Sequence, residues 1–342
     1  MHSARQHSIL FIFLAIAFLL LFAVNISVGA VSVPIKDVVT SLTGNGASKS
    51  AWEYIVVNYR LPKAITAIIA GMGLSVSGLL MQTLFRNPLA GPDVLGLSSG
   101  ASLGVAFIIL GAGLLPASIA VTFLSPYGMV LASVFGSVVV LLAVLLVAQK
   151  LRDTMAILIV GLMFTSFTGA VVGVLTYFSS AEQLQKFTYW SLGSLGSLPA
   201  ENIIILAVTC LIGLLLAAVC IKPLDALLLG ERYAQSLGIN FKRTRLIIIL
   251  ATSLLAGSIT AFAGPIAFVG LAVPHMARLL FRTGSHLVLF WATLLLGGIV
   301  LLGCDTISQL PGEFTLPINA VTSIIGAPVV IWLLLRKNRM MV

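Results

Sequence analysis

Charged residues are scarce in this sequence: only 8% of its 342 residues are Asp, Glu, Lys or Arg, whereas 59% are hydrophobic. A soluble protein of this length needs more ionisable groups than that to cover its surface. The nineteen basic and ten acidic residues also fall into short clusters. Between them lie stretches long enough to cross a bilayer, which takes about 20 apolar residues as a helix. The sequence therefore predicts an all-α, polytopic membrane protein.

Reactive side chains are equally few. The three cysteines, Cys210, Cys220 and Cys304, lie in or beside apolar stretches, which argues against a disulfide framework or a zinc site. The four histidines, at positions 2, 7, 275 and 286, do not group with the sparse carboxylates. We therefore expect no enzyme: the sequence indicates no catalytic, cofactor-binding or metal-binding residues.

An energy source is also missing from the chain. None of the eight lysines follows a glycine, so there is no P-loop to bind ATP. A carrier driven by protons or sodium commonly places Asp, Glu or His inside a span, yet no Asp, Glu, Lys or Arg lies deep in any expected span. His275 lies near a helix end and favours a structural role, and no selectivity filter is evident. A permease without its own energy source remains.

Helix breakers and basic clusters predict the topology. Pro116 and residues 125–128 divide the long uncharged stretch 94–149, and Gly264-Pro265 divides 246–277, so that each supplies two spans. This gives ten spans within the uncharged stretches 6–35, 64–85, 94–149, 154–181, 202–221, 246–277, 283–304 and 314–335. Fourteen of the nineteen basic residues then lie on one side, which predicts that both termini are cytoplasmic. The basic pI of 9.8 therefore reflects topology, and no nucleic-acid partner is needed.

The N-terminal segment allows an alternative. Arg5, the apolar run 9–24 and the small residues 28–30 are also typical of a cleavable signal peptide, whose removal would leave nine spans. Inner-membrane permeases need no such signal, so we expect the first helix to be retained.

Several motifs occur in a fixed order along the chain. They are Arg60-Leu61-Pro62-Lys63, residues 85–93, residues 95–101, Leu229-Gly230-Glu231 with Leu237-Gly238, residues 264–278, and Leu316-Pro317-Ile318 with Gly326-Ala327-Pro328. From about residue 55 to 336 this order resembles the FecCD/BtuC-like permease family, the transmembrane subunits of type II ABC importers for iron–siderophore chelates, haem and vitamin B12. The chain departs from the family pattern at Ala267, Gln309 and Asn319.

The resemblance assigns residues 222–245, the longest polar insertion, to the coupling helices that fit a groove on the ATPase. The residues that it implies for ATPase coupling are Leu229, Gly230, Glu231, Arg232, Ala234, Leu237 and Gly238. From the residues alone, the same segment is compatible with a membrane-interface helix that has no partner.

Three further sites follow from the same resemblance. Arg60 and Lys63 match the basic pair that docks the substrate-binding protein, with Gln309 at the position of a third docking arginine and Lys186 as a substitute for it. A cytoplasmic gate is implied at Asn87, Leu89, Thr154, Met155 and Ile159. A translocation pathway is implied at Tyr189, Trp190 and Asn319. As alternatives, the basic pair could anchor a helix end at the lipid headgroups, and the gate residues could be helix caps and core packing.

The assembly implied by the resemblance is a homodimer of one 342-residue permease domain, joined by two ABC ATPase subunits and a substrate-binding protein. ATP and Mg would bind to the ATPases, and the pathway at the homodimer interface would alternate its access across the bacterial inner membrane. The substrate stays open among ferric siderophore, haem and cobalamin, although Met155 argues against cobalamin. The competing class is a secondary carrier for a hydrophobic solute.

Small residues predict close helix contacts. Gly100 with Gly104 and Gly169 with Gly173 have the i, i+4 spacing that lets membrane helices approach each other. With 31 glycines in the chain, chance alone produces such pairs, so the spacing is a weak signal.

Overall fold

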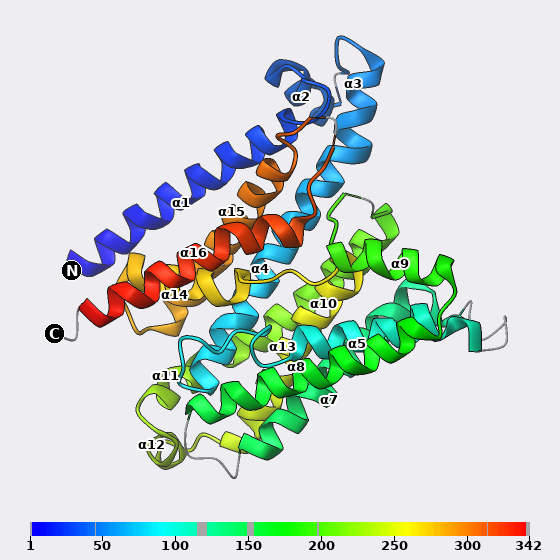
Figure 1. Cartoon of the computed structure of the whole chain (residues 1–342). Helices are drawn as coiled ribbons and strands as arrows, with labels where there is room; N and C mark the ends of the chain where they lie inside the picture. The colour runs from blue at the N-terminus through cyan, green and yellow to red at the C-terminus, as the bar shows by residue number, and fades with distance from the viewer. Residues whose placement is uncertain are drawn as a thin grey trace.

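The computed structural model describes residues 2–44, 46–114, 122–148, 154–196, 198–312 and 314–339, and within these residues every regular element is a helix (Figure 1). Seven helical segments are long and apolar enough to cross a membrane. They are α1 (His2–Ser27), α4 (Leu61–Leu84) with the short helices before it, α7 (Pro126–Ala148), α8 (Thr154–Tyr177), α10 (Ala200–Val219), α13 (Phe241–Ala263) and α15 (His286–Ser308).

Three shorter apolar helices complete the bundle: α5 (Leu97–Gly111), α14 (Val269–Phe281) and the apolar part of α16 (Ile318–Arg339). Together with the seven long segments they occupy the positions of the ten predicted spans. The predicted division of 246–277 is confirmed, since α13 ends at Ala263 and α14 begins at Val269. Gly264 and Phe268 between them have positive φ angles of 75° and 66°, outside the helical region.

Short helices lie at the two ends of the bundle. One end carries α2 (Ile35–Leu42), α3 (Ser50–Ile55), the π-helix η1 (Val56–Arg60), the 3₁₀ turn η2 (Ala112–Leu114) and α9 (Ala181–Leu192). The other carries α11 (Ile221–Leu228) and α12 (Glu231–Ser236). We call these the outer and inner ends, after the sides that the basic residues predict. The beginning of α1 and the end of α16 both lie at the inner end (Figure 1).

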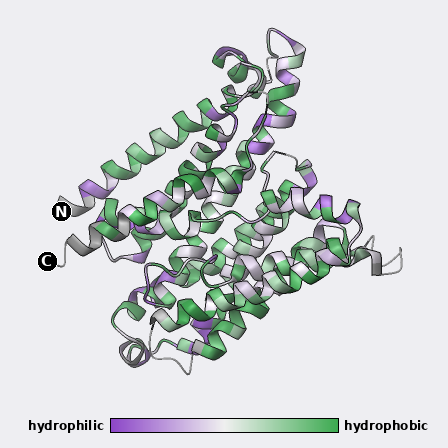
Figure 2. Cartoon of the chain, viewed as in Figure 1, coloured by the Kyte–Doolittle hydropathy of each residue, from purple (hydrophilic) through white to green (hydrophobic). Residues whose placement is uncertain are grey.

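Helix α4 is the centre of the fold. Of the best apolar window in the segment Ser50–Leu84, 78% of the residues are buried, and α4 packs against α10, α13, α14 and α15. By contrast, only 17% of the corresponding window of α1 and 11% of that of α8 are buried. Hydrophobic residues cover the length of these peripheral helices, while hydrophilic residues gather at the ends of the bundle (Figure 2). Such an exposed apolar surface requires a bilayer or a partner helix around it.

Glycines let the central helices approach closely. A Cβ on Gly100 would lie 2.4 Å from the carbonyl oxygen of Gly136, and one on Gly104 would lie 2.0 Å from that of Ala132. The first predicted pair therefore packs α5 against α7. The second pair differs, because a Cβ on Gly169 or Gly173 would meet nothing within 4 Å among the described residues. These two glycines lie on an open face of α8.

Candidate functional site

A cavity of about 710 Å³ occupies the outer end. The segment that follows α1, η1, the start of α4, the end of α9, the end of α15 and the start of α16 all contribute to it. It brings together three predicted site residues, Arg60, Lys63 and Tyr189, and also contains Gln309. Residues predicted from separate motifs thus surround a single cavity.

Arg60 is buried at the edge of this cavity, with 7% of its surface exposed. Its guanidinium donates hydrogen bonds to the carbonyl oxygens of Ile26 and Ser27, each at 2.8 Å, and to that of Val31. The last carbonyls of a helix have no partner within the helix, and a cation there also suits the helix dipole. Arg60 therefore caps the C-terminus of α1. A docking contact would require it to leave these carbonyls, so docking stays a prediction that the contacts of Arg60 do not favour.

Lys63 also has an internal partner. Its ammonium group lies 3.0 Å from Oδ1 of Asp305, and the side chains are only 14% and 1% exposed. Asp305 Oδ2 accepts two further hydrogen bonds, each at 2.8 Å, from Asn25 and Gln309. The ion pair joins α4 to α15, and Asn25 adds α1. Docking by Lys63 thus also remains a prediction, and Gln309, at the position of the third docking residue, serves this buried cluster.

The predicted pathway residues lie near the same cavity but have different surroundings. Tyr189 on α9 is 66% exposed. Trp190 is half-buried and donates from Nε1 to the carbonyl oxygen of Ala261 at 3.0 Å, which ties α9 to α13. Asn319, in the first turn of α16, has a buried side-chain oxygen that accepts no hydrogen bond from the described residues. Asn319 therefore has a polar atom without a partner among the described residues, Tyr189 is largely exposed, and Trp190 positions its helix.

Arg60 provides the first testable prediction. Replacing it with Met removes three charge-assisted hydrogen bonds and leaves the carbonyls at the end of α1 unpaired. We expect Arg60→Met to lower the free energy of unfolding by about 2–3 kcal/mol. Thermal unfolding in detergent measures this, with Lys36→Met, at an exposed lysine of α2, as control. An Arg60→Met protein that is as stable as the wild type but no longer binds its binding protein would instead favour docking.

The predicted gate loop lies at the inner end of α4, where residues 85–96 lead into α5. Asn87 is 7% exposed, and its side-chain oxygen accepts a hydrogen bond from the amide of Leu89 at 2.9 Å. Asp93 accepts from the Ser98 hydroxyl and, at 3.2 Å, from the amide of Phe268. Burial raises the pKa of the Asp93 carboxyl, and these two hydrogen bonds lower it in part. The loop is therefore anchored to both α5 and the start of α14.

The other half of the predicted gate lies on α8. A Cβ on Gly161 would be 2.5 Å from the carbonyl oxygen of Val94, so the loop rests directly on this helix. Ile159, two residues earlier, is 57% exposed. The side chains of Thr154 and Met155 lie outside the described part of the structure. The structure thus brings the loop beside α8, and the gate itself remains a prediction.

The predicted coupling segment projects from the inner end (Figure 1). Helix α11 buries Leu224 and Leu227, while Gly230, with a φ of 114°, separates it from α12. Ala234 is fully buried. Four large apolar side chains remain exposed at 52–66% of their surface, namely Leu228, Leu229, Tyr233 and Leu237. The side chains of Glu231 and Arg232 lie outside the described part.

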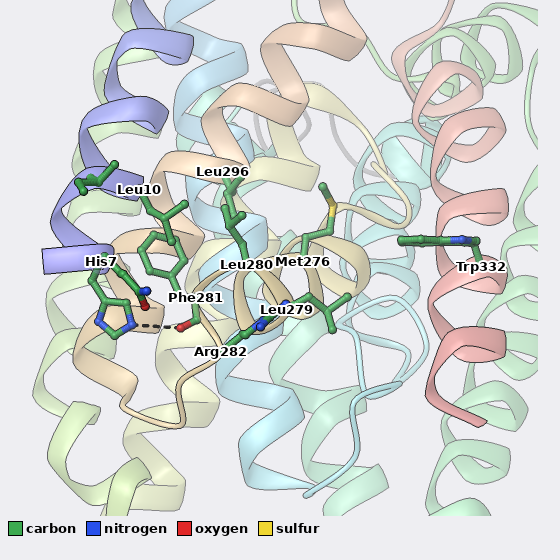
Figure 3. Close-up of a pocket in the computed structure, with 11 residues that line it drawn as sticks. His7, Leu10, Met276, Leu279, Leu280, Phe281, Arg282, Leu296 and Trp332 are labelled. Atoms are coloured by element: carbon green, nitrogen blue, oxygen red, sulfur yellow. Dashed lines mark hydrogen bonds between the residues drawn. The ribbon is translucent and has the colours of Figure 1, made fainter. Parts of the chain in front are cut away.

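A second cavity, of about 700 Å³, lies among α1, α14, α15 and α16 (Figure 3). His7 Nε2 is 3.0 Å from the carbonyl oxygen of Phe281 at its edge, and the ring of Phe11 packs against that of Phe281 at a tilt of 45°, with centroids 4.8 Å apart. The lining is otherwise mainly apolar, and none of the predicted site residues belongs to it.

The residues that sequence reasoning missed are buried polar ones. Asp305 ends the charge-free stretch 283–304 in the sequence, yet it lies inside α15 and is 1% exposed. His286 is likewise 1% exposed and contacts Asp225 and Thr83. The available signal was the position of each polar residue at the border of an apolar run. Its partner lies far away along the chain, where no local pattern indicates it.

Known proteins resemble this chain over nearly its whole length. The sequence profile of the FecCD transport family matches residues 16–336. The chain belongs to the FecCD transport family. Among its relatives, the hemin transport system permease protein HmuU of Yersinia pestis is 34% identical over 332 residues, which cover 95% of this chain and 96% of HmuU. The vitamin B12 import system permease protein BtuC of Klebsiella pneumoniae is 35% identical over 285 residues, 82% of each chain.

A solved structure supports the fold assignment of this FecCD family member. An inward-facing ABC transporter assigned to the metal-chelate type superposes with a TM-score of 0.79 at 26% identity, covering 96% of this chain and 99% of that one. The all-α fold and the family predicted from the motifs are therefore confirmed. This FecCD protein is a multi-pass membrane protein.

Proposed function

We propose that this FecCD family protein is the permease subunit of an ATP-driven importer for an iron chelate, either a siderophore complex or haem, or for vitamin B12. Two copies form a pathway in the bacterial inner membrane, with both termini cytoplasmic, and two separate ATPase subunits supply the energy. A substrate-binding protein delivers the substrate at the outer end. The family relatives named for hemin and vitamin B12 support this substrate range.

The exposed apolar surface at the inner tip is the observation that carries the proposal. Leu228, Leu229, Tyr233 and Leu237 stand on a segment that also carries the predicted coupling residues. An exposed apolar cluster rimmed by polar residues is typical of a protein–protein contact. Since the sequence contains no P-loop, an ATPase is the partner whose energy the chain needs.

The open face of α8 supports the second copy. Ile159, Leu162, Met163, Phe167 and Val174 are each at least 57% exposed, and Gly169 and Gly173 lie open on the same helix. Small residues on such a face allow another helix to approach closely. A pathway between two such faces presents weakly binding apolar groups, which suit a bulky chelate that must pass through.

The competing secondary carrier would need a coupling acid within the membrane. Within the described spanning helices the candidate is Asp305, because its carboxyl is buried inside α15. However, Lys63, Asn25 and Gln309 all bind its carboxylate, and it lies in the last turn of the helix. A carboxylate held in this way is better suited to a structural ion pair than to cycles of protonation.

Introducing a charge at Leu237 and reversing the charge at Glu231, both at the inner tip, tests the proposal. We expect Leu237→Asp and Glu231→Arg to lose the copurifying ATPase, with affinity reduced at least about 30-fold for a central contact. Leu42→Asp, at an exposed leucine of α2 at the opposite end, is the matched control and should retain it. Substrate-stimulated ATP hydrolysis with haemin, cyanocobalamin and a ferric hydroxamate then identifies the cargo. Transport by Glu231→Arg at the wild-type rate would sink the coupling assignment.

A further inference from the structure

A chain of three polar side chains joins α11 to the inner ends of α15 and α4. Asp225 Oδ1, on α11, accepts the backbone amide of His286 at 2.7 Å and lies 2.8 Å from Nδ1 of the same residue. On the other side of the ring, His286 Nε2 is 2.8 Å from the hydroxyl of Thr83 on α4. His286 thus bridges two helices that are distant in sequence.

Asp225 provides the N-terminal cap of α15 from another helix. His286 is the first residue of α15, and Ser285, at the capping position, makes no side-chain cap. A carboxylate that accepts a first-turn amide satisfies one of the unpaired donors there and suits the positive end of the helix dipole. The start of α15 therefore depends on the position of α11.

Two of these three side chains are buried, so their hydrogen-bonding groups must be satisfied inside the protein. His286 is 1% and Thr83 3% exposed, whereas the Asp225 side chain is 42% exposed. The carboxylate accepts the hydrogen of Nδ1, so the Thr83 hydroxyl can donate to a neutral Nε2. If Nε2 is protonated, Thr83 accepts from it and donates to the carbonyl oxygen of Leu79, 3.1 Å away. The bridge is satisfied in either charge state of the imidazole.

Gln82, the residue before Thr83 in α4, extends the connection to α14. Gln82 donates to the carbonyl oxygen of Leu271 at 3.0 Å and accepts from the guanidinium of Arg278. The last turn of α4 is therefore bound through side chains to α14 as well as to α15. Since α4 is the most buried of the seven long spanning segments, a displacement of its inner end would act on the helices that pack around it.

Hydrogen bonds between helices transmit a helix movement better than apolar packing does, because they depend on direction. Leu224 and Leu227 of α11 pack on the bundle and can slide over neighbouring carbon atoms. The hydrogen bonds of Asp225 and His286 weaken steeply when their geometry changes. If α11 moves, it must either break them inside the protein, which leaves buried groups unpaired, or carry the ends of α15 and α4 with it.

We propose that Asp225, His286 and Thr83 are the link through which movement of the coupling segment reaches α15 and α4, with His286 as the positioning residue at its centre. This inference rests on the proposed function, because it requires that an ATPase binds the inner tip.

The test uses the complete complex with its ATPase and a reporter at the outer end. Tyr189→Cys, labelled with an environment-sensitive fluorophore, reports on the outer cavity, since the three natural cysteines are buried. ATP with vanadate is expected to change its emission in the otherwise wild-type complex. Thr83→Val, which keeps the shape of the side chain, should reduce this change about three- to tenfold, the effect of one lost hydrogen bond, and Asp225→Ala, which loses two contacts to His286, should reduce it at least as much. Basal ATP hydrolysis and ATPase copurification should persist in Thr83→Val, whose side chain is buried in α4.

Conservative variants separate transmission from simple stability. Thr83→Ser keeps the hydroxyl, and Asp225→Asn keeps an acceptor oxygen, so both should recover much of the emission change. Thr209→Val is the matched control, because the Thr209 hydroxyl bonds only within α10 in the described structure. A lower unfolding temperature with an unchanged emission response would mean that the contacts only stabilise the fold and would overturn the inference.

Two further outcomes are distinguishable. If Asp225→Ala loses the ATPase, Asp225 belongs to the docking surface, and the inference is wrong although the proposed function stands. If the wild-type chain binds no ATPase, the proposed function fails, and the link fails with it.

Discussion

Replacing Asp305 with alanine is expected to lower the free energy of unfolding by about 3–5 kcal/mol, since it leaves the buried ammonium group of Lys63 without its partner. The two ionic groups lie 3.0 Å apart and are 14% and 1% exposed. Asn25 and Gln309 lose their shared acceptor in the same variant. Denaturant unfolding in detergent micelles measures the loss.

Two comparisons make this expectation specific. The exposed pair Lys186 and Glu182 has an even shorter separation, 2.6 Å, but its side chains are 67% and 75% exposed, so Glu182→Ala should produce no measurable change. The double variant Lys63→Met with Asp305→Leu removes both charges and should recover much of the lost stability. An Asp305→Ala protein as stable as the wild type would contradict the structural role of this ion pair.

The contrast between these two ion pairs shows which features the sequence could predict. Lys186 and Glu182 are one helical turn apart on α9, so their contact follows from helical spacing alone. Lys63 and Asp305 come from opposite halves of the chain, and hydropathy placed both merely at the borders of spans. Hydropathy predicted the spans correctly because the apolar length of a helix is a local property. The pairing of polar residues at the helix ends depends on which helices become neighbours.

Arg60 shows the same limit in the candidate site. Its position before Pro62 and Lys63 indicated the family, and the resemblance suggested a contact outside the chain. In the structure its guanidinium binds the end of α1, a partner that no motif specifies. In the coupling segment, by contrast, the break between α11 and α12 falls at Gly230, whose φ of 114° suits glycine, so this break is a local signal.

Glycine pairs with the same spacing in the sequence have different surroundings in the structure. Gly100 and Gly104 touch α7, whereas Gly169 and Gly173 touch nothing within 4 Å among the described residues. Whether a glycine allows close helix contact therefore depends on how near the backbone of the neighbouring helix lies. The closest approach of this kind involves Gly78 of α4, where a Cβ would lie 1.7 Å from the carbonyl oxygen of Gly270 in α14.

Gly78→Ala is accordingly expected to force α4 and α14 apart. The obstructing atom belongs to the backbone and cannot rotate away, so we expect a loss at or above the upper end of the 1–3 kcal/mol that is typical of overpacking, about 3 kcal/mol. Separation also strains the hydrogen bond from Gln82 to Leu271 and the one from Phe268 to Asp93, which anchors the gate loop. Thermal unfolding and the yield of monodisperse protein in detergent measure the effect.

Gly169→Ala is the matched control for this substitution. It adds the same methyl group to another spanning helix, at a position with open space around it, and alanine favours the helix more than glycine does. A single protomer should therefore keep or slightly raise its stability. If Gly78→Ala and Gly169→Ala behaved alike, the close contact of α4 with α14 would be wrong. If Gly169→Ala impaired only the assembled transporter, the open face of α8 would be a contact with the second copy, as the proposed homodimer requires.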